Sequence, residues 1–70
     1  RDARLQYLAG MACRKRQLWG KAQQLLTQAS SQLGDAGLRA SAWRTLAELA
    51  QARGDDAAAA EAWKKAALSR

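Results

Sequence analysis

The sequence predicts an all-α protein whose four helices form two antiparallel helix–turn–helix hairpins. Its 70 residues contain no Pro, no Phe and only five Gly. They are rich in Ala, Leu, Gln and Arg, which are strong helix formers. Residues that favour strands are scarce, since the sequence has no Val or Ile and only two Thr. One pattern of small and apolar residues also occurs twice with the same internal spacing, which indicates two similar units.

The repeated pattern sets the size of each unit. Intervals of 12, four and three residues connect two sets of positions: Gly10, Ala22, Leu26 and Ala29, and Ala47, Ala59, Trp63 and Ala66. Small residues at such positions let two helices approach closely, so each unit is predicted to be a helix, a tight turn and a second helix. The units cover about 3–33 and about 36–70 of a single domain over 1–70, which we expect to be part of a longer repeat protein.

The first hairpin is expected to consist of a helix over about 3–16 and a helix over about 19–32. Asp2 can act as the N-cap of the first of these helices. Apolar residues at steps of three and four mark the side that each helix should bury: Leu5, Leu8, Ala9, Ala12 and Cys13, then Ala22, Leu25, Leu26 and Ala29. Trp19 is expected to cover the interface of these two helices. An exposed Trp19 would instead be an interaction anchor.

The second hairpin is expected to pair helices over about 36–53 and about 56–69. Asp35 can cap the first of them, although Gly37 weakens its first turn, so the helix could begin at Leu38 or later. Gly54 and Asp55 supply a left-handed turn residue and an N-cap. The residues expected to be buried are Ala42, Trp43, Leu46, Leu49 and Ala50, followed by Ala59, Ala62, Trp63, Ala66 and Ala67.

The composition argues against catalysis. The chain has no His for general base work or metal ligation, and it has no Gly-rich phosphate loop. The adjacent carboxylates Asp55 and Asp56 are explained by capping. Cys13, the single cysteine, is expected to be a small buried hydrophobe. We therefore expect a non-enzymatic protein with no cofactor and no metal.

The second unit resembles the tetratricopeptide repeat signature in Trp43-x-x-Leu46-Ala47, Gly54-Asp55 and Ala59-x-x-x-Trp63-x-x-Ala66. The resemblance covers nearly the whole chain but is weaker in the first unit, where Gln6, Ala9 and Cys13 replace Trp, Leu and Tyr. The period of 37 residues exceeds the usual 34, with the extra residues in the stretch 33–39. What the resemblance implies is a right-handed α-solenoid that serves as a protein–protein interaction scaffold.

Within that family, the segments 10–13 (Gly-Met-Ala-Cys) and 18–22 (Leu-Trp-Gly-Lys-Ala) are similar to the C-terminal repeat region of proteobacterial HemY-type proteins. Those proteins have an N-terminal inner-membrane anchor and a helical repeat tail, and they are linked to late haem and porphyrin synthesis. The resemblance implies a soluble scaffold domain near haem-making enzymes, in a parent protein anchored in a bacterial inner membrane.

In such repeats the first helix of each hairpin lines a concave groove. The groove residues are then Arg4, Tyr7, Met11, Arg14 and Lys15 from the first helix, and Arg44, Glu48 and Gln51 from the third. Arg grips carboxylates with two parallel hydrogen bonds, and Met adapts to varied shapes. An extended acidic peptide with an apolar anchor is the predicted ligand. The alternative is that these charges form a solvated helix face.

The net charge of +6 also fits nucleic acid or anionic lipid, which we keep as the rival partner class. The densest basic run, Arg14-Lys15-Arg16, lies where cations oppose the helix dipole and so needs no ligand to explain it. Two imperfect units fall short of the three or more that repeat proteins usually need. We therefore also expect self-association through the exposed faces of the first and fourth helices.

Overall fold

The computed structural model describes residues 2–69, and within this range it contains four α-helices and no strand. They are α1 (Ala3–Lys15), α2 (Trp19–Ser30), α3 (Ala36–Ala52) and α4 (Asp56–Leu68). The predicted all-α class and the number of helices are confirmed. Each helix begins at the predicted residue and ends one or two residues early. No helix within residues 2–69 combines the length and hydrophobicity needed to cross a membrane.

Short-range chemistry fixes the helix starts. The side chains of Asp2, Asp35 and Asp55 accept hydrogen bonds from the backbone N–H groups of Arg4 (2.9 Å), Leu38 (3.0 Å) and Ala58 (3.0 Å). These bonds satisfy N–H groups that lack a partner in the first turn. The cap on Asp35 keeps the start of α3 at Ala36 despite Gly37. In contrast, α2 begins after Leu18 without a side-chain cap.

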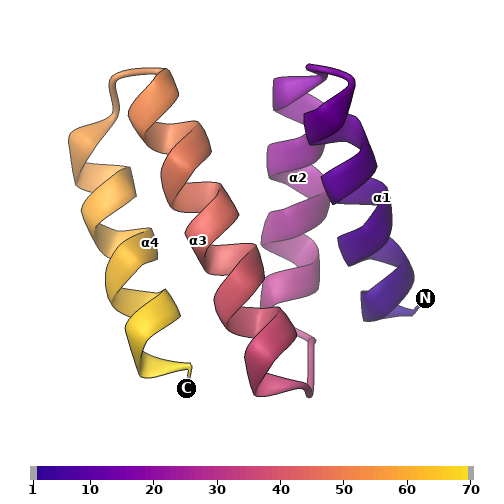
Figure 1. Ribbon diagram of the computed structural model, residues 1–70. Coiled ribbons are helices and arrows are strands. Elements are labelled where there is room, and N and C mark those ends of the chain that lie inside the picture. Colours follow the sequence, from indigo (N-terminus) through magenta and orange to yellow (C-terminus); the bar gives the residue numbers. More distant parts are fainter. Residues whose placement is uncertain (1, 70) are drawn as a thin grey trace.

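Two turns use the left-handed region of backbone conformation. Gly54, between α3 and α4, has a φ of 81°, as its lack of a Cβ atom permits. Gln17, between α1 and α2, has a φ of 64° although it carries a side chain. The two turns reverse the chain, so α1 runs antiparallel to α2 and α3 antiparallel to α4 (Figure 1).

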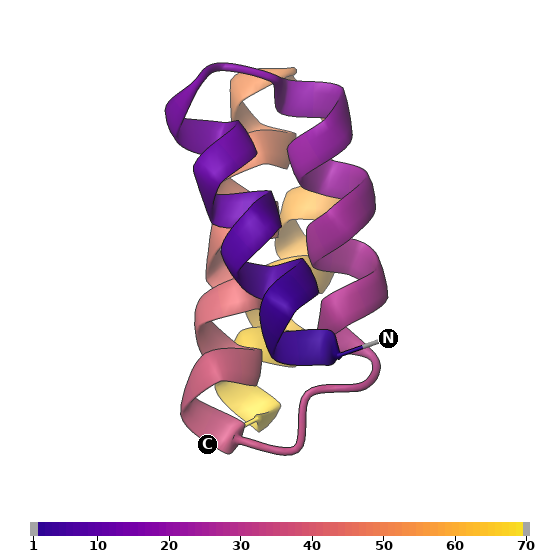
Figure 2. The same cartoon turned by 90° about the vertical axis from the view of Figure 1, so that its right-hand side faces the viewer.

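The four helices lie in chain order (Figure 1), and the main packing is within the pairs α1–α2 and α3–α4, with a smaller contact between α2 and α3. Seen from the α1 side, α1 and α2 lie in front of α3 and α4 (Figure 2). The Cα atoms span 30 × 28 × 14 Å, so the molecule is a thin slab. Arg39 supports the connection between α2 and α3, because its guanidinium donates a 2.9 Å hydrogen bond to the carbonyl oxygen of Leu33.

The core is built mainly from alanines, together with Leu26, Leu33, Leu46 and Leu49. Leu26 is the largest side chain that is fully buried in the described part of the chain, and Ala22, Ala29, Ala42 and Ala47 are also completely inaccessible. Gly10 of α1 is buried against Leu26, at the closest approach of α1 and α2. The repeat pattern placed Gly10 and Ala22 where helices meet, and the burial of both residues agrees with that placement.

Burial predictions are wrong on the two outer helices, α1 and α4. On α1, Leu5 and Leu8, expected inside, are 64% and 60% exposed, and Ala9 and Ala12 are exposed as well. The side of α1 that faces the core carries Gly10 and the partly buried Tyr7 and Met11 instead. Since α1 lies at one end of the row of helices, its opposite side has no neighbour (Figure 1).

On α4, Trp63 is 38% exposed and Ala67 is exposed as well, although both were expected to be buried. Trp43 is only partly buried, and the ammonium group of Lys65 lies 4.6 Å from the centre of its ring. At this distance the cation is attracted to the face of the aromatic ring. Trp43 lines a shallow cavity together with Ala58, Glu61 and Ala62 of α4.

Candidate protein-binding surface

Helices α1 and α3 share one surface of the slab, because two side-chain contacts link them. The hydroxyl groups of Tyr7 and Ser41 lie 2.8 Å apart, and an Nη atom of Arg14 lies 3.2 Å from a carboxylate oxygen of Glu48. Both contacts join residues 34 positions apart in the sequence. A constant offset means that α1 and α3 run parallel. We call this surface the α1/α3 face.

The structure brings some of the predicted groove residues together and separates others. Tyr7, Arg14 and Glu48 meet as described. Met11, like Tyr7, is partly buried against the core rather than displayed toward a ligand. Arg4, Lys15, Arg44 and Gln51 are exposed. Arg44 lies on the same side of α3 as Ser41 and Glu48, since it is three and four residues from them, and it lines a shallow cavity with Trp63 of α4.

The charges of the α1/α3 face are only partly neutralised. The ion pair between Arg14 and Glu48 is solvent-exposed, and such pairs contribute about 0–1 kcal/mol to stability. It is therefore weak enough to exchange for a ligand carboxylate. Within residues 2–69, Arg4, Lys15 and Arg44 form no ion pair. These three cations are available to an anionic partner.

The hydrogen bond between Tyr7 and Ser41 gives a direct test of the contact between α1 and α3. Tyr7→Phe removes the phenol oxygen and leaves the ring in place, so we expect a loss of about 0.5–1.5 kcal/mol in the free energy of unfolding. Urea denaturation followed by circular dichroism measures the loss. Ser41→Ala should cost a similar amount, and the double variant should cost no more than either single one. Additive losses would contradict a shared bond.

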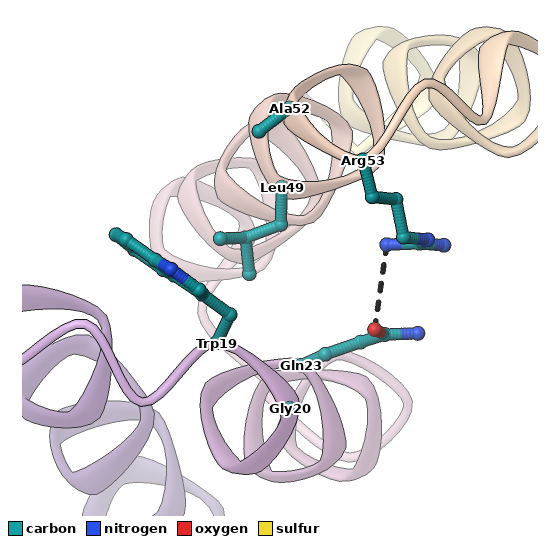
Figure 3. A pocket seen from close by; sticks show the side chains of 6 residues that line it. All are labelled: Trp19, Gly20, Gln23, Leu49, Ala52 and Arg53. Carbon is teal, nitrogen blue, oxygen red and sulfur yellow. Dashed lines mark hydrogen bonds between the residues drawn. The ribbon is translucent and has the colours of Figure 1, made fainter.

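A pocket of about 320 Å³ opens between the start of α2 and the end of α3. Trp19, Gly20 and Gln23 line it from α2, and Leu49, Ala52 and Arg53 line it from α3 (Figure 3). The Trp19 ring stands on one side, and on the other Arg53 donates a 3.3 Å hydrogen bond to the side-chain oxygen of Gln23 (Figure 3). The lining is thus mainly apolar, with one cation at its rim.

The expected role of Trp19 as a cover for the α1–α2 interface is therefore wrong. Its side chain is 53% exposed and lies against α3 instead. The sequence analysis gave the alternative that an exposed Trp19 in this turn would be an interaction anchor, and the exposure of Trp19 favours that alternative. The residues of α3 that line the pocket could not be predicted from the sequence, because no sequence pattern within α2 or α3 shows which of their residues meet in the folded chain.

The structure also gives the surroundings of the groups considered for chemistry. Asp55 caps α4 and lies 3.5 Å from the guanidinium of Arg53. Cys13 is partly buried next to the core. In the described range 2–69, no cluster of three or more His, Cys, Asp or Glu side chains could hold a metal ion.

Comparison with known proteins adds no relative, since no family model, no curated protein and no solved structure matches the chain.

Proposed function

We propose that the chain is a non-catalytic interaction module that binds an acidic peptide or helix along the α1/α3 face. The observation that carries the proposal is the parallel contact of α1 and α3, which gives a ligand one continuous surface built from two helices. The parallel contact of the first helices of two successive hairpins supports a tetratricopeptide-like solenoid as the architecture.

The charges of the face select the ligand. Arg4 and Lys15 project from α1, and Arg14 can exchange Glu48 for a carboxylate of the ligand. Arg binds carboxylates through two parallel hydrogen bonds, which favours a ligand with several Asp or Glu side chains. Arg44 extends the positive charge toward α4.

The Trp19 pocket supplies the apolar anchor of the proposed ligand. Ala52 lines this pocket and follows Glu48 by four residues on α3, so the two lie on the same side of that helix. A peptide on the α1/α3 face can therefore place one apolar side chain beside Trp19. Because Tyr7 and Met11 are partly buried, we assign the anchoring role to this pocket.

The resemblance to HemY-type proteins extends the proposal to a biological setting. In that setting the module is a soluble part of a protein anchored in a bacterial inner membrane, and its ligands are segments of enzymes of late haem and porphyrin synthesis.

The proposal is tested by NMR shift mapping with a Glu-rich peptide that carries one Leu, and with the same peptide after Glu→Gln exchange. We expect shifts at Arg4, Arg14, Glu48 and Trp19 with the acidic peptide only. Arg4→Glu should weaken binding about fivefold or more, since an exposed ion pair contributes up to about 1 kcal/mol and a repulsion replaces it. Lys21→Glu, an equal change of charge at an exposed position of α2, is the control and should leave the affinity nearly unchanged.

A random-sequence oligonucleotide in the same experiment distinguishes the rival partner class. Diffuse shifts around Arg14, Lys15 and Arg16 with either ligand, lost steeply on adding salt, would contradict a peptide site. That result would indicate a basic surface for nucleic acid or anionic lipid, because release of counterions makes such binding strongly salt-dependent.

A further inference from the structure

The outward side of α1 is an apolar stripe without a covering helix. Leu5 and Leu8 are 64% and 60% exposed, and Ala9 and Ala12 are exposed beside them. The four residues occupy positions i, i+3, i+4 and i+7, so they form one side of the helix. Such a stripe on an outer helix resembles an interface more than an ordinary solvated surface.

The internal repeat identifies what kind of element covers this stripe. Adding the 37-residue period to Leu5, Leu8, Ala9 and Ala12 gives Ala42, Thr45, Leu46 and Leu49. All four of these α3 residues are buried, with exposures of 0, 5, 7 and 8%. Leu49 lies beside Trp19 and Gln23 of α2, and Leu46 lies beside Gln23 and Thr27. The equivalent stripe on α3 is thus covered by the second helix of the preceding hairpin.

The opposite end of the molecule offers a matching helix. The α2 residues that border α3 are Trp19, Gly20, Gln23 and Thr27, and their equivalents on α4 are Asp56, Ala57, Ala60 and Lys64. All four α4 residues are exposed. The two alanines leave room for the leucines of α1 to approach. One copy therefore carries both halves of the contact, at opposite ends of its row of helices.

Charges favour the same arrangement. Where α2 packs on α3, the first residues of α2 lie beside the last residues of α3, as Trp19 and Arg53 show (Figure 3). In the equivalent contact, Asp56 at the start of α4 would lie beside Lys15 and Arg16 at the end of α1. All three side chains are exposed. Opposite charges thus meet at this end of the contact.

We propose that a second copy of the chain docks head to tail, with its α4 on the apolar stripe of α1 in the first copy. The contact repeats the packing of α2 on α3 and uses the side of α1 that points away from the core. A head-to-tail contact uses two different surfaces, so it does not close after two copies and produces longer assemblies.

The test uses two variants that each block one surface, Leu8→Glu on α1 and Ala60→Glu on α4. Both positions are exposed, so the fold should be retained, which circular dichroism verifies. Sedimentation equilibrium up to about 1 mM should show wild-type assemblies larger than a dimer. Each variant alone should associate at least about tenfold more weakly, because a buried Leu contributes about 1.5–3 kcal/mol. Gln24→Glu, an exposed change of the same charge on α2, should associate like the wild type.

An equimolar mixture of the two variants is the decisive sample. The intact α4 of the Leu8→Glu variant can dock on the intact α1 of the Ala60→Glu variant, so dimers should form and grow no further. A monomeric wild type at about 1 mM would overturn the proposal and leave the stripe to another occupant. Association of the Ala60→Glu variant as strongly as the wild type would also overturn it, because the contact would then not depend on α4.

Discussion

Gly10→Val is expected to lower the free energy of unfolding by about 1–3 kcal/mol, the usual range for overpacking a core. A Cβ atom at Gly10 would lie 2.8 Å from Cγ and 2.9 Å from Cδ2 of Leu26. Leu26 is fully buried and cannot swing aside. The new side chain must therefore push α1 away from α2 along their closest contact. Urea denaturation followed by circular dichroism measures the change.

Gly20 provides a matched control, because it is also helical but nothing lies within 4 Å of a Cβ atom placed there. Gly20→Ala should stabilise the fold by up to about 1 kcal/mol through helix propensity alone. Gly10→Ala receives the same benefit but also meets Leu26, so it should fall well below Gly20→Ala. Equal stability of the Gly10→Val variant and the wild type would contradict the close approach of α1 and α2.

Leu26→Ala is expected to cost about 2–5 kcal/mol and to leave the chain largely unfolded. Removing a buried leucine side chain loses its transfer free energy and leaves a cavity. Leu26 is fully inaccessible, while most of the core around it is alanine. The core of a domain this small rarely supplies more than about 3–5 kcal/mol. This one substitution therefore removes most of the free energy of unfolding. Thermal unfolding followed by circular dichroism at 222 nm measures the loss.

Leu8→Ala is the comparison for this prediction. Leu8 is 60% exposed, so its truncation should change the stability of the monomer by no more than about 0.5 kcal/mol. Both variants are compared at low micromolar concentration, where association does not contribute. A Leu26→Ala variant that melted with the wild type would show that Leu26 is not central to the core. The double variant Gly10→Val/Leu26→Ala should lose less than the sum of both, because removal of the leucine makes room for valine.

The positions of the helices could be predicted because local chemistry determines them. Asp2, Asp35 and Asp55 cap three helices through hydrogen bonds that span two or three residues. Gly54 adopts the left-handed conformation that only its own residue type readily allows. Such signals require no knowledge of the tertiary structure. The predicted starts of α1, α3 and α4 agree with the structure for this reason, whereas α2 begins at the predicted Trp19 without a side-chain cap.

The inward side of α1 could not be predicted by the size of its apolar side chains. At about 100° per residue, Leu5 and Leu8 lie about 140° and 200° around the helix from Gly10. The sequence therefore contained two conflicting signals, a stripe of leucines and a glycine for close approach. The glycine marked the buried side. An apolar stripe shows that a side can be covered, but not that a neighbour is present within the same chain.

The candidate site was predictable only in part. The pairing of Arg14 with Glu48 follows from charges on two helices that were expected to line one face. The pocket at Trp19 depends on the turn before α2, where Gln17 takes a left-handed conformation without being glycine. No local pattern indicates that conformation in a residue with a side chain. The direction of Trp19 toward α3 is consequently a property of the folded molecule.

The concentration of packing within the pairs α1–α2 and α3–α4 also determines how the chain can fold. The packed pairs are joined by connections of only a few residues. Little chain entropy is lost in closing such short loops before the apolar contacts form. Proteins dominated by contacts of this kind have low contact order and are among the fastest to fold. The same row of helices, whose two outer sides are not covered, thus has a small entropic barrier to folding.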